Sequence, residues 1–163
     1  MEIVVRPLLE RDWNNVSKIY IDGIATGIAT FETECPNWIQ WDKKYISKCR
    51  YVAVIKNDIV GFAVLAPASK RIVYNGVAEV SVYVALNYRG KGIGNILLNT
   101  LVDESEKEGF WTLQASIFSE NKPSIKMHLK CGFKMIGIRE KIGKLNGKWY
   151  DNHFLEKRSK IIN

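Results

Sequence analysis

The sequence predicts a single α/β domain over residues 1–163, and three observations predict it. Stretches with the period-two alternation of strands are interspersed with stretches of helical periodicity along the whole chain. Near its middle, the strand-like residues 79–84 lead through a glycine-rich turn straight into an amphipathic segment. No linker, repeat or low-complexity stretch divides the sequence, which is long enough to bury a core without disulfides.

The first third of the chain predicts one strand and two helices. Residues 3–5 form a strand that ends before Pro7. Asp12 is placed to cap a helix that gives out between residues 23 and 27. The apolar positions of that helix are Val16, Ile19, Tyr20 and Ile24. Pro36 suits the first turn of a second helix. An aromatic stripe on that helix indicates packing rather than cofactor contact: Trp38, Trp41 and Tyr45.

A hairpin precedes the strand at the glycine-rich turn. Residues 51–55 and 59–66 are its two strands, joined by a tight turn at residues 57–58. Pro67 ends the second strand, and residues 69–76 form a polar connection to the next one.

The second half of the chain begins with a helix that runs from the glycine-rich turn to Lys107, stopped by Gly109. Its buried face consists of Ile93, Leu97, Leu98, Leu101 and Val102. Residues 111–117 are rich in apolar side chains, which predicts a central strand.

The chain then predicts a short helix and a closing hairpin. Pro123 begins the helix, which runs to Lys130 and is capped by Gly132. Residues 133–145 and 148–155 form a hairpin around an Asn-Gly turn.

Composition excludes several classes of protein. The net charge of +7 admits nucleic acid or a phosphate-bearing ligand, but no basic helix with interleaved aromatic residues is present, so we expect no nucleic-acid partner. No apolar segment has the length of a membrane span or a targeting signal. Three cysteines at no metal-like spacing, Cys35, Cys49 and Cys131, predict reduced thiols in a cytoplasmic protein without a metal.

The glycine-rich turn has the features of an anion site. Gly90, Gly92 and Gly94 remove side chains where backbone amides must approach a ligand. The helix that begins there adds unpaired N–H groups and a partial positive charge, and Arg89 and Lys91 add full charges. The spacing fits neither a P-loop nor a dinucleotide-binding fingerprint. A phosphate-bearing cofactor is the prediction, and a turn without a ligand is the alternative.

The stretch Arg89-Gly90-Lys91-Gly92-Ile93-Gly94 resembles the Arg/Gln-x-x-Gly-x-Gly/Ala motif of the GNAT superfamily of N-acetyltransferases. Further stretches are similar to its phosphinothricin N-acetyltransferase-like branch. They are residues 30–31, Lys70-Arg71 with Tyr74, and residues 79–84, 121–128 and 147–151, while residues 131–133 match the wider superfamily. The resemblance covers nearly the whole chain, and these stretches follow one another in the same order as in the family.

This resemblance implies a GNAT-like fold: a mixed, twisted sheet flanked by helices, whose central strands splay apart. Acetyl-CoA would enter the gap as cosubstrate, with no metal. Its pantetheine arm would pair with the backbone of the strand before the turn. The implied cofactor-binding residues are Val82, Tyr83, Val84, Arg89, Gly90, Lys91, Gly92, Ile93, Gly94, Asn95 and Asn121.

Glu79 is the first candidate catalytic residue. At pH 7 an amine with a pKa near 10 is only about 0.1% neutral, so acetyl transfer benefits from a base. Strand alternation places Glu79 on one face with Ser81 and Tyr83, where partial burial should raise its pKa. The family uses a Glu at the matching position as its proposed base. A solvated or salt-bridged strand carboxylate is the alternative.

His128 is the second candidate. Many members of the family have a Tyr at the matching place that protonates the departing CoA thiolate, and this branch has His. Since His titrates near neutrality, His128 is an acid, a base or a hydrogen-bond anchor, or it is structural.

The acceptor must be recognised by the loops. The resemblance implies substrate binding by Phe31, Lys70, Arg71 and Tyr74, with the Arg suited to a carboxylate or phosphinate; plain surface charge is the alternative for Lys70. Ala68 stands where relatives often have a Trp, and residues 28–35 keep little in common with them. A differently shaped acceptor pocket is therefore expected.

The predicted function is transfer of the acetyl group of acetyl-CoA to the α-amine of a small amino-acid-like acceptor. Phosphinothricin and methionine sulfoximine or sulfone are examples, which would confer antibiotic or herbicide resistance, and the family implies a homodimer. One alternative is acetylation of a protein or peptide amine. Another is a non-catalytic module that binds CoA or nucleic acid.

Overall fold

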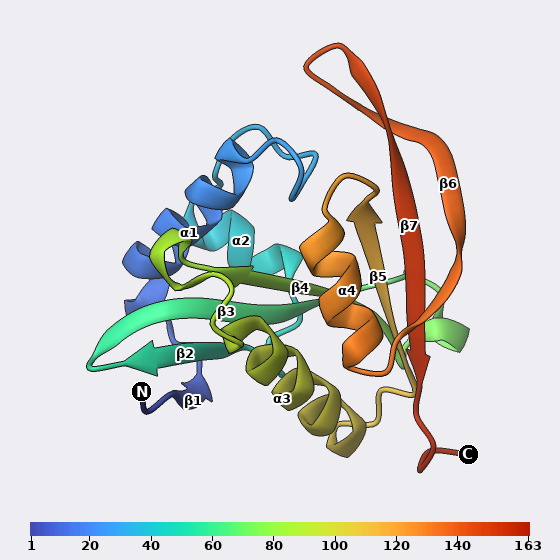
Figure 1. The fold of residues 1–163 in the computed structure, drawn as a ribbon. Coiled ribbons are helices and arrows are strands. Elements are labelled where there is room, and N and C mark those ends of the chain that lie inside the picture. Colours follow the sequence, from blue (N-terminus) through green and yellow to red (C-terminus); the bar gives the residue numbers. More distant parts are fainter.

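The computed structural model describes all 163 residues and places every strand in one seven-stranded sheet. The order across the sheet is β1-β2-β3-β4-β5-β7-β6. Only β4 and β5 run parallel, so the sheet is mixed, as the resemblance implies, and Figure 1 shows its twist. The strands are β1 (Val4–Pro7), β2 (Tyr51–Ile55), β3 (Asp58–Pro67), β4 (Val77–Val84), β5 (Thr112–Phe118), β6 (Lys134–Leu145) and β7 (Lys148–Arg158).

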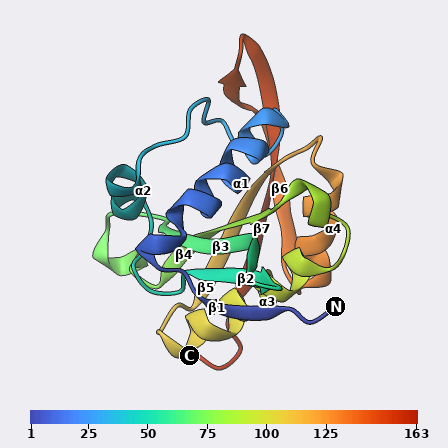
Figure 2. The ribbon, with the colours of Figure 1, turned by 90° about the vertical axis from the view of Figure 1, so that its left-hand side faces the viewer.

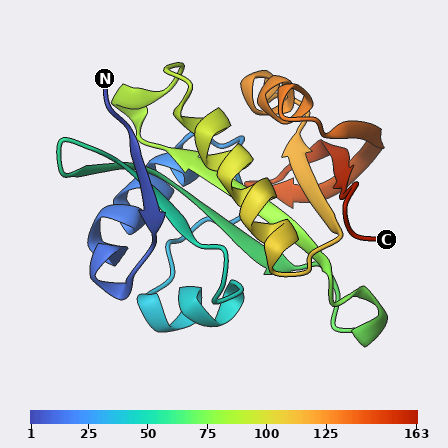
Figure 3. The same cartoon turned by 90° about the horizontal axis from the view of Figure 1, so that it is seen from below.

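Helices cover both faces of this sheet. The four α-helices are α1 (Trp13–Ala25), α2 (Trp38–Lys44), α3 (Ile93–Lys107) and α4 (Lys122–Lys130). Figures 2 and 3 show α1 and α2 on one face, with α3 and α4 on the other. Three short 3₁₀ turns complete the structure: η1 (Glu10–Asp12), η2 (Ile72–Tyr74) and η3 (Leu86–Tyr88). None of the helices is both long and apolar enough to cross a bilayer.

Each face of the sheet has its own core. The apolar stripe of α3 packs with alternate residues of β3, β4 and β5, including Leu65, Val80 and Leu113. On the opposite face, α1 and the aromatic stripe of α2 pack on β2 and β3. Trp41 and Tyr45 are buried there, with their ring centroids 4.8 Å apart, so the interpretation of that stripe as packing is confirmed.

The central strands of the sheet separate after a short contact. β4 and β5 are in register only at Val77–Thr112, Ala78–Leu113 and Glu79–Gln114. Beyond Glu79 the two strands diverge, and the edge of β4 that faces β5 has no strand partner. The implied splay is confirmed, and it begins at the candidate base.

The starts of the first two helices differ from the predictions in how they are capped. Asp12 precedes α1 but caps no helical amide: its carboxylate accepts from the Leu9 N–H at 2.8 Å and pairs with Arg6 at 2.7 Å. Pro36 precedes α2 instead of opening it. Asn37 is the cap there, and its Oδ1 accepts from the Gln40 N–H at 2.9 Å.

Strand ends also differ from the predictions. β1 continues through Pro7 because it is an edge strand, where a missing N–H is tolerated. β4 starts at Val77, two residues earlier than predicted. The first hairpin turns at Lys56 and Asn57, both with positive φ (49° and 73°), instead of at residues 57–58.

Candidate active site

A long cleft of about 550 Å³ lies along the separated edge of β4. Its walls come from β4, the glycine-rich turn, the start of α3, the end of α1 and the start of α4. The lining residues predicted to bind a cofactor are Val82, Tyr83, Val84, Arg89, Gly90, Gly92, Ile93, Gly94, Asn95 and Asn121. Lys91 is not among the lining residues, and its ammonium lies 5.1 Å from the centre of the Tyr88 ring. The structure thus brings all but one of the predicted cofactor residues together.

The glycine-rich turn presents a row of free donors to this cleft. None of the six backbone N–H groups from residue 90 to residue 95 donates a hydrogen bond within the chain. Gly90 and Gly92 have φ of +74° and +82°, a backbone conformation that a side chain disfavours. A Cβ on Gly94 would lie 2.6 Å from the Met127 sulfur of α4. Free amides at the start of a 15-residue helix fit an anionic group such as a diphosphate.

Arg89 ties this turn to the end of β4. Its Nε donates to the Val84 carbonyl oxygen at 3.1 Å. The rest of the guanidinium makes no ion pair, so its charge remains available beside the free amides.

A second hollow, of about 280 Å³, adjoins the cleft on the α1–α2 side of the sheet. It contains Glu79 and is closed by residues 28–31, the end of α2, β5 and α4. Both spaces are lined by Ile28, Ala29, Val82, Tyr83, Asn121 and Ser124. The two therefore meet at the point where β4 and β5 have separated. We call the larger space the cofactor cleft and the smaller one the acceptor cavity.

Strand alternation places Glu79 as predicted. Tyr83 packs with the α1–α2 core, stacked on Phe62 with their ring centroids 5.2 Å apart, whereas Val80 packs with α3. Glu79 shares the face of Tyr83 and lines the acceptor cavity. Burial raises the pKa of Glu79, and the charges of Arg139 and Lys44 oppose that shift. A carboxylate with a raised pKa accepts a proton more readily near neutrality.

Lys44 and Tyr45 are cavity residues that sequence reasoning missed. Both lie at the end of α2 and line the acceptor cavity. Lys44 pairs with Glu32 at 3.3 Å, and burial raises the pKa of Tyr45 to about 12. In the sequence Tyr45 belongs to an aromatic stripe that predicts packing, and nothing in that pattern indicates that it also lines a cavity.

His128 lines the acceptor cavity and is only 4% exposed. Its Nδ1 lies 2.7 Å from the Ser124 carbonyl oxygen, and a carbonyl can only accept, so Nδ1 carries the proton. Burial lowers the pKa of His128, which favours the neutral ring at pH 7. The neutral ring then has a lone pair on Nε2 and no proton free to donate.

Asn121 stands at the boundary between the cleft and the cavity. Its Oδ1 caps α4 by accepting from the Ser124 N–H at 3.3 Å, and its Nδ2 donates to the Ile28 carbonyl oxygen at 3.4 Å. Asn121 thereby joins the residue 28–31 segment to α4 across the top of the gap between β4 and β5.

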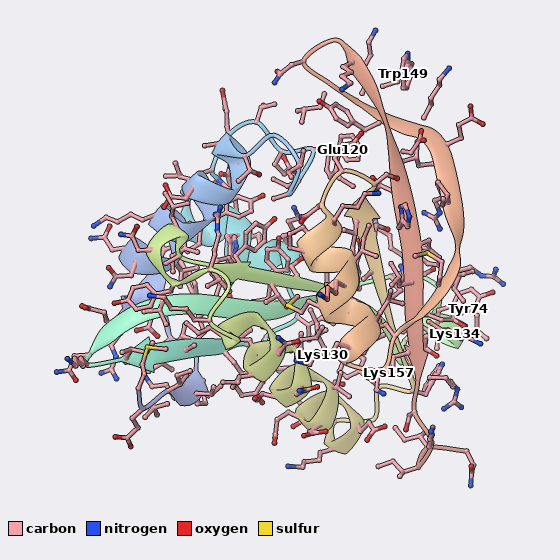
Figure 4. All side chains as sticks on the ribbon, viewed as in Figure 1. Tyr74, Glu120, Lys130, Lys134, Trp149 and Lys157 are labelled. Carbon is pink, nitrogen blue, oxygen red and sulfur yellow. The ribbon has the colours of Figure 1, made fainter.

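The predicted acceptor-binding residues divide into two groups. Phe31 lines the acceptor cavity and packs on Phe118 with their ring centroids 4.5 Å apart. Lys70, Arg71 and Tyr74 are exposed and do not line it. They belong to the η2 segment, which projects away from the body of the molecule in Figure 3; Figure 4 shows Tyr74 next to Lys134 in that view, far from Glu120 above β5.

Comparisons with known proteins agree with this geometry. Residues 12–133 match the family model described as the acetyltransferase (GNAT) family. The phosphinothricin N-acetyltransferase of Streptomyces viridochromogenes is 28% identical over 95% of this chain and 87% of its own. The L-methionine sulfoximine/L-methionine sulfone acetyltransferase of Pseudomonas aeruginosa is 36% identical over 51% of this chain and 48% of its own.

Solved structures share the whole fold. The ribosomal-protein-alanine N-acetyltransferase of Brucella melitensis superposes with a TM-score of 0.89 at 29% identity, covering 96% of this chain and 99% of its own. A phosphinothricin acetyltransferase of Sinorhizobium meliloti, solved in complex with AcCoA, gives 0.87 at 26% identity, covering 99% and 96%.

Proposed function

The chain belongs to the acetyltransferase (GNAT) family, and from that premise we propose that it acetylates the α-amine of a small amino-acid-like acceptor. The observation that carries this proposal is the meeting of the cofactor cleft and the acceptor cavity beside the separated end of β4. An acyl group that reaches this junction along the cleft faces a cavity lined by a carboxylate of raised pKa, that of Glu79.

The cofactor cleft supports acetyl-CoA as the cosubstrate. The free amides of residues 90–95 and the charge of Arg89 would hold its diphosphate. The unpaired edge of β4 at Val82–Val84 would pair with its pantetheine arm, near Asn121. Acetyl-CoA supplies the thioester from which the acetyl group is taken.

Glu79 is the proposed base. It takes a proton from the acceptor's ammonium, directly or through water, and the neutral nitrogen attacks the thioester carbonyl. The new C–N bond forms as the C–S bond breaks, and the thiolate that leaves takes up a proton. One acceptor ammonium and one acetyl-CoA thus give one amide, one CoA thiol and one released proton. Glu79 must be ionised to act, so activity should rise with pH as Glu79 loses its proton.

His128 is proposed as a positioning residue and not as the acid. Its one ring proton is bonded to the Ser124 carbonyl, so the neutral ring holds no proton for a leaving thiolate. Nε2 offers a lone pair to water or to the acceptor, which would orient either group next to Glu79.

Two features support a small acceptor. The acceptor cavity is lined by Phe31, Tyr45 and neighbouring side chains, and its volume of about 280 Å³ suits a small molecule. The relatives named above act on phosphinothricin and on methionine sulfoximine or sulfone. Lys70, Arg71 and Tyr74 are proposed to contribute to acceptor binding, which requires the η2 segment to approach the cavity. Resistance to such compounds is the proposed biological role.

Acetylation of a protein amine is the second candidate, because a structural neighbour is a ribosomal-protein-alanine N-acetyltransferase. The test is an acceptor panel with thiol detection of released CoA. It contains methionine sulfone, phosphinothricin, free amino acids and peptides with N-terminal alanine. We expect release with the amino-acid analogues and not with the peptides. Release with peptides alone would overturn the small-acceptor proposal.

We further propose that residues 1–163 act as one domain in the cytoplasm and form a homodimer. The single sheet that takes strands from both ends of the chain supports the first point. Three free thiols support the second. Exposed apolar side chains on η2 and β6, Ile72, Val73, Ile136 and Ile138, support the third, which sedimentation equilibrium tests.

A further inference from the structure

Asn152 of β7 is a buried amide without a partner. It is 7% exposed and lines the acceptor cavity, but its side chain makes no hydrogen bond within the chain. Its Oδ1 is fully shielded from solvent and has no hydrogen-bond partner. Its Nδ2 is not fully shielded, and it is therefore the atom of this amide that a ligand in the cavity can reach. Buried polar side chains nearly always have a hydrogen-bond partner, and the exceptions call for an explanation. A ligand in the cavity is such an explanation.

Arg139 of β6 stands beside this amide. The strand register pairs Arg139 with Asn152, and Asn152 with Phe118 of β5. Paired residues point to the same face of a sheet, so Arg139 lies on the same face as the acceptor cavity, where it is exposed at the rim and is not one of the lining residues. Its guanidinium lies over the Phe154 ring, 4.1 Å from the centroid, and Phe154 pairs with Ser116, which lines the cavity. Arg139 therefore reaches back along the sheet towards Glu79.

Arg139 makes no ion pair in the chain, although its charge acts on Glu79 from a distance. No carboxylate lies within ion-pair distance of it, and its side chain makes no hydrogen bond. Lys44, the other cation near Glu79, is paired with Glu32. A stacked guanidinium keeps its N–H groups in one plane, and that arrangement suits the two oxygens of a carboxylate.

We propose that Asn152 and Arg139 form the subsite for the carboxylate of the acceptor. Arg139 donates to the two carboxylate oxygens, and Asn152 Nδ2 donates to one of them. The acceptor is thereby held by its acid group on β6 and β7, while its amine faces Glu79 on β4. This inference rests on the proposed function and gives the acceptor class as amines that carry a carboxylate.

The experiment compares Asn152→Leu and Arg139→Met with the wild type, using methionine sulfone and its carboxamide as acceptors. Both variants should raise the KM for methionine sulfone about tenfold or more, since each removes a hydrogen bond to a charged group. At a pH above the acidic limb, the KM for acetyl-CoA should stay within about twofold, and the KM for the carboxamide should be the same in all three proteins. Arg11→Met removes an exposed arginine far from the cavity and is the control.

Measuring the Tm of each variant distinguishes a loss of acceptor binding from a loss of folded protein. Because the Asn152 amide makes no hydrogen bond in the free protein, Asn152→Leu should leave Tm unchanged or higher while KM rises. Should Asn152→Leu fail to fold, Arg139→Met decides alone, because its side chain is exposed.

Three outcomes would overturn the inference. The first is an unchanged KM for methionine sulfone in both variants with an active wild type, and it leaves the proposed function standing. The second is an equal rise in KM for the carboxamide, which means that no carboxylate is recognised. The third is a wild type that binds acetyl-CoA but turns over no small amine: the proposed function then fails and the subsite with it.

Discussion

The cofactor cleft and the acceptor cavity adjoin, but the first presents mainly backbone groups to a ligand and the second mainly side chains. The cleft offers backbone: six free N–H groups at the glycine-rich turn and the unpaired edge of β4. The cavity offers side chains from α2, β4, β5, α4 and β7, each placed by a different part of the fold. A backbone site depends on where helices and strands end, whereas a side-chain site depends on the register of distant segments. Substitutions should therefore affect the two KM values separately.

The largest effect is expected in the cavity, from Glu79→Gln. The amide cannot take a proton from the acceptor, so kcat at pH 7 should fall about 100-fold or more. The loss should shrink at high pH, where more of the amine is already neutral. Steady-state rates across pH measure both effects, with Glu10→Gln as a control at an exposed carboxylate. A pH profile like that of the wild type would remove Glu79 from the role of base.

The next effect is expected in the cleft, from Gly92→Ala. Its φ of +82° disfavours a side chain by about 1–2 kcal/mol, so the turn should shift and the KM for acetyl-CoA should rise roughly tenfold. Gly109→Ala is the matched control, because Gly109 has a φ of +91° at the other end of α3. Equal loss of stability in both variants, with a changed KM only in Gly92→Ala, would locate the anion site. An effect on the acceptor KM alone would contradict the separation of the two sites.

A smaller effect is expected from His128→Asn. The asparagine amide can still donate to the Ser124 carbonyl oxygen, so the end of α4 should hold its shape and kcat should fall by less than about tenfold. Rates with saturating substrates test this. A fall as large as that of Glu79→Gln would give His128 a direct part in proton transfer.

The smallest effect is a displacement of the pH profile. Arg139 lowers the pKa of Glu79 by its charge, so Arg139→Met should raise that pKa. Since Glu79 must be ionised, the acidic limb of kcat/KM should move to higher pH, with activity lost below it. Arg11→Met should leave the limb in place. A limb that stays in place, as it should in Arg11→Met, would show that Arg139 does not act on the base.

The fold was predictable where short-range signals decide it. The helix after the glycine-rich turn was predicted to end at Lys107, as observed, because its apolar positions, the glycines before it and Gly109 after it are all local. Asp12 stands at the predicted N-cap position of α1, but its side chain does not cap the helix, because Arg6 on a different element takes its carboxylate. No local pattern shows which of two competing partners a carboxylate will choose.

The candidate site, like the fold, was predictable only where its residues carry a local sequence signal. Glu79 and the glycine-rich turn follow from alternation and from a motif, and both lie where they were expected. Asn152 and Arg139 carry no local signal, because they become neighbours only through the pairing of β5, β7 and β6. The reverse also holds for Lys70 and Arg71, which match the family's pattern but lie outside the cavity.

The three-residue contact between β4 and β5 has a consequence for how firmly the molecule holds together. Strands β1–β4 and β5–β7 form two half-sheets that are hydrogen-bonded to each other only through this short contact. Elsewhere the packing of α3 and α4 connects them. A cosubstrate bound between the two half-sheets would stabilise their relative position, because it would form backbone hydrogen bonds with the part of β4 that does not pair with β5. At a concentration of 100 Kd it would add about 2.7 kcal/mol to the free energy of unfolding. The lifetime of the folded enzyme would then follow the supply of its own acetyl donor.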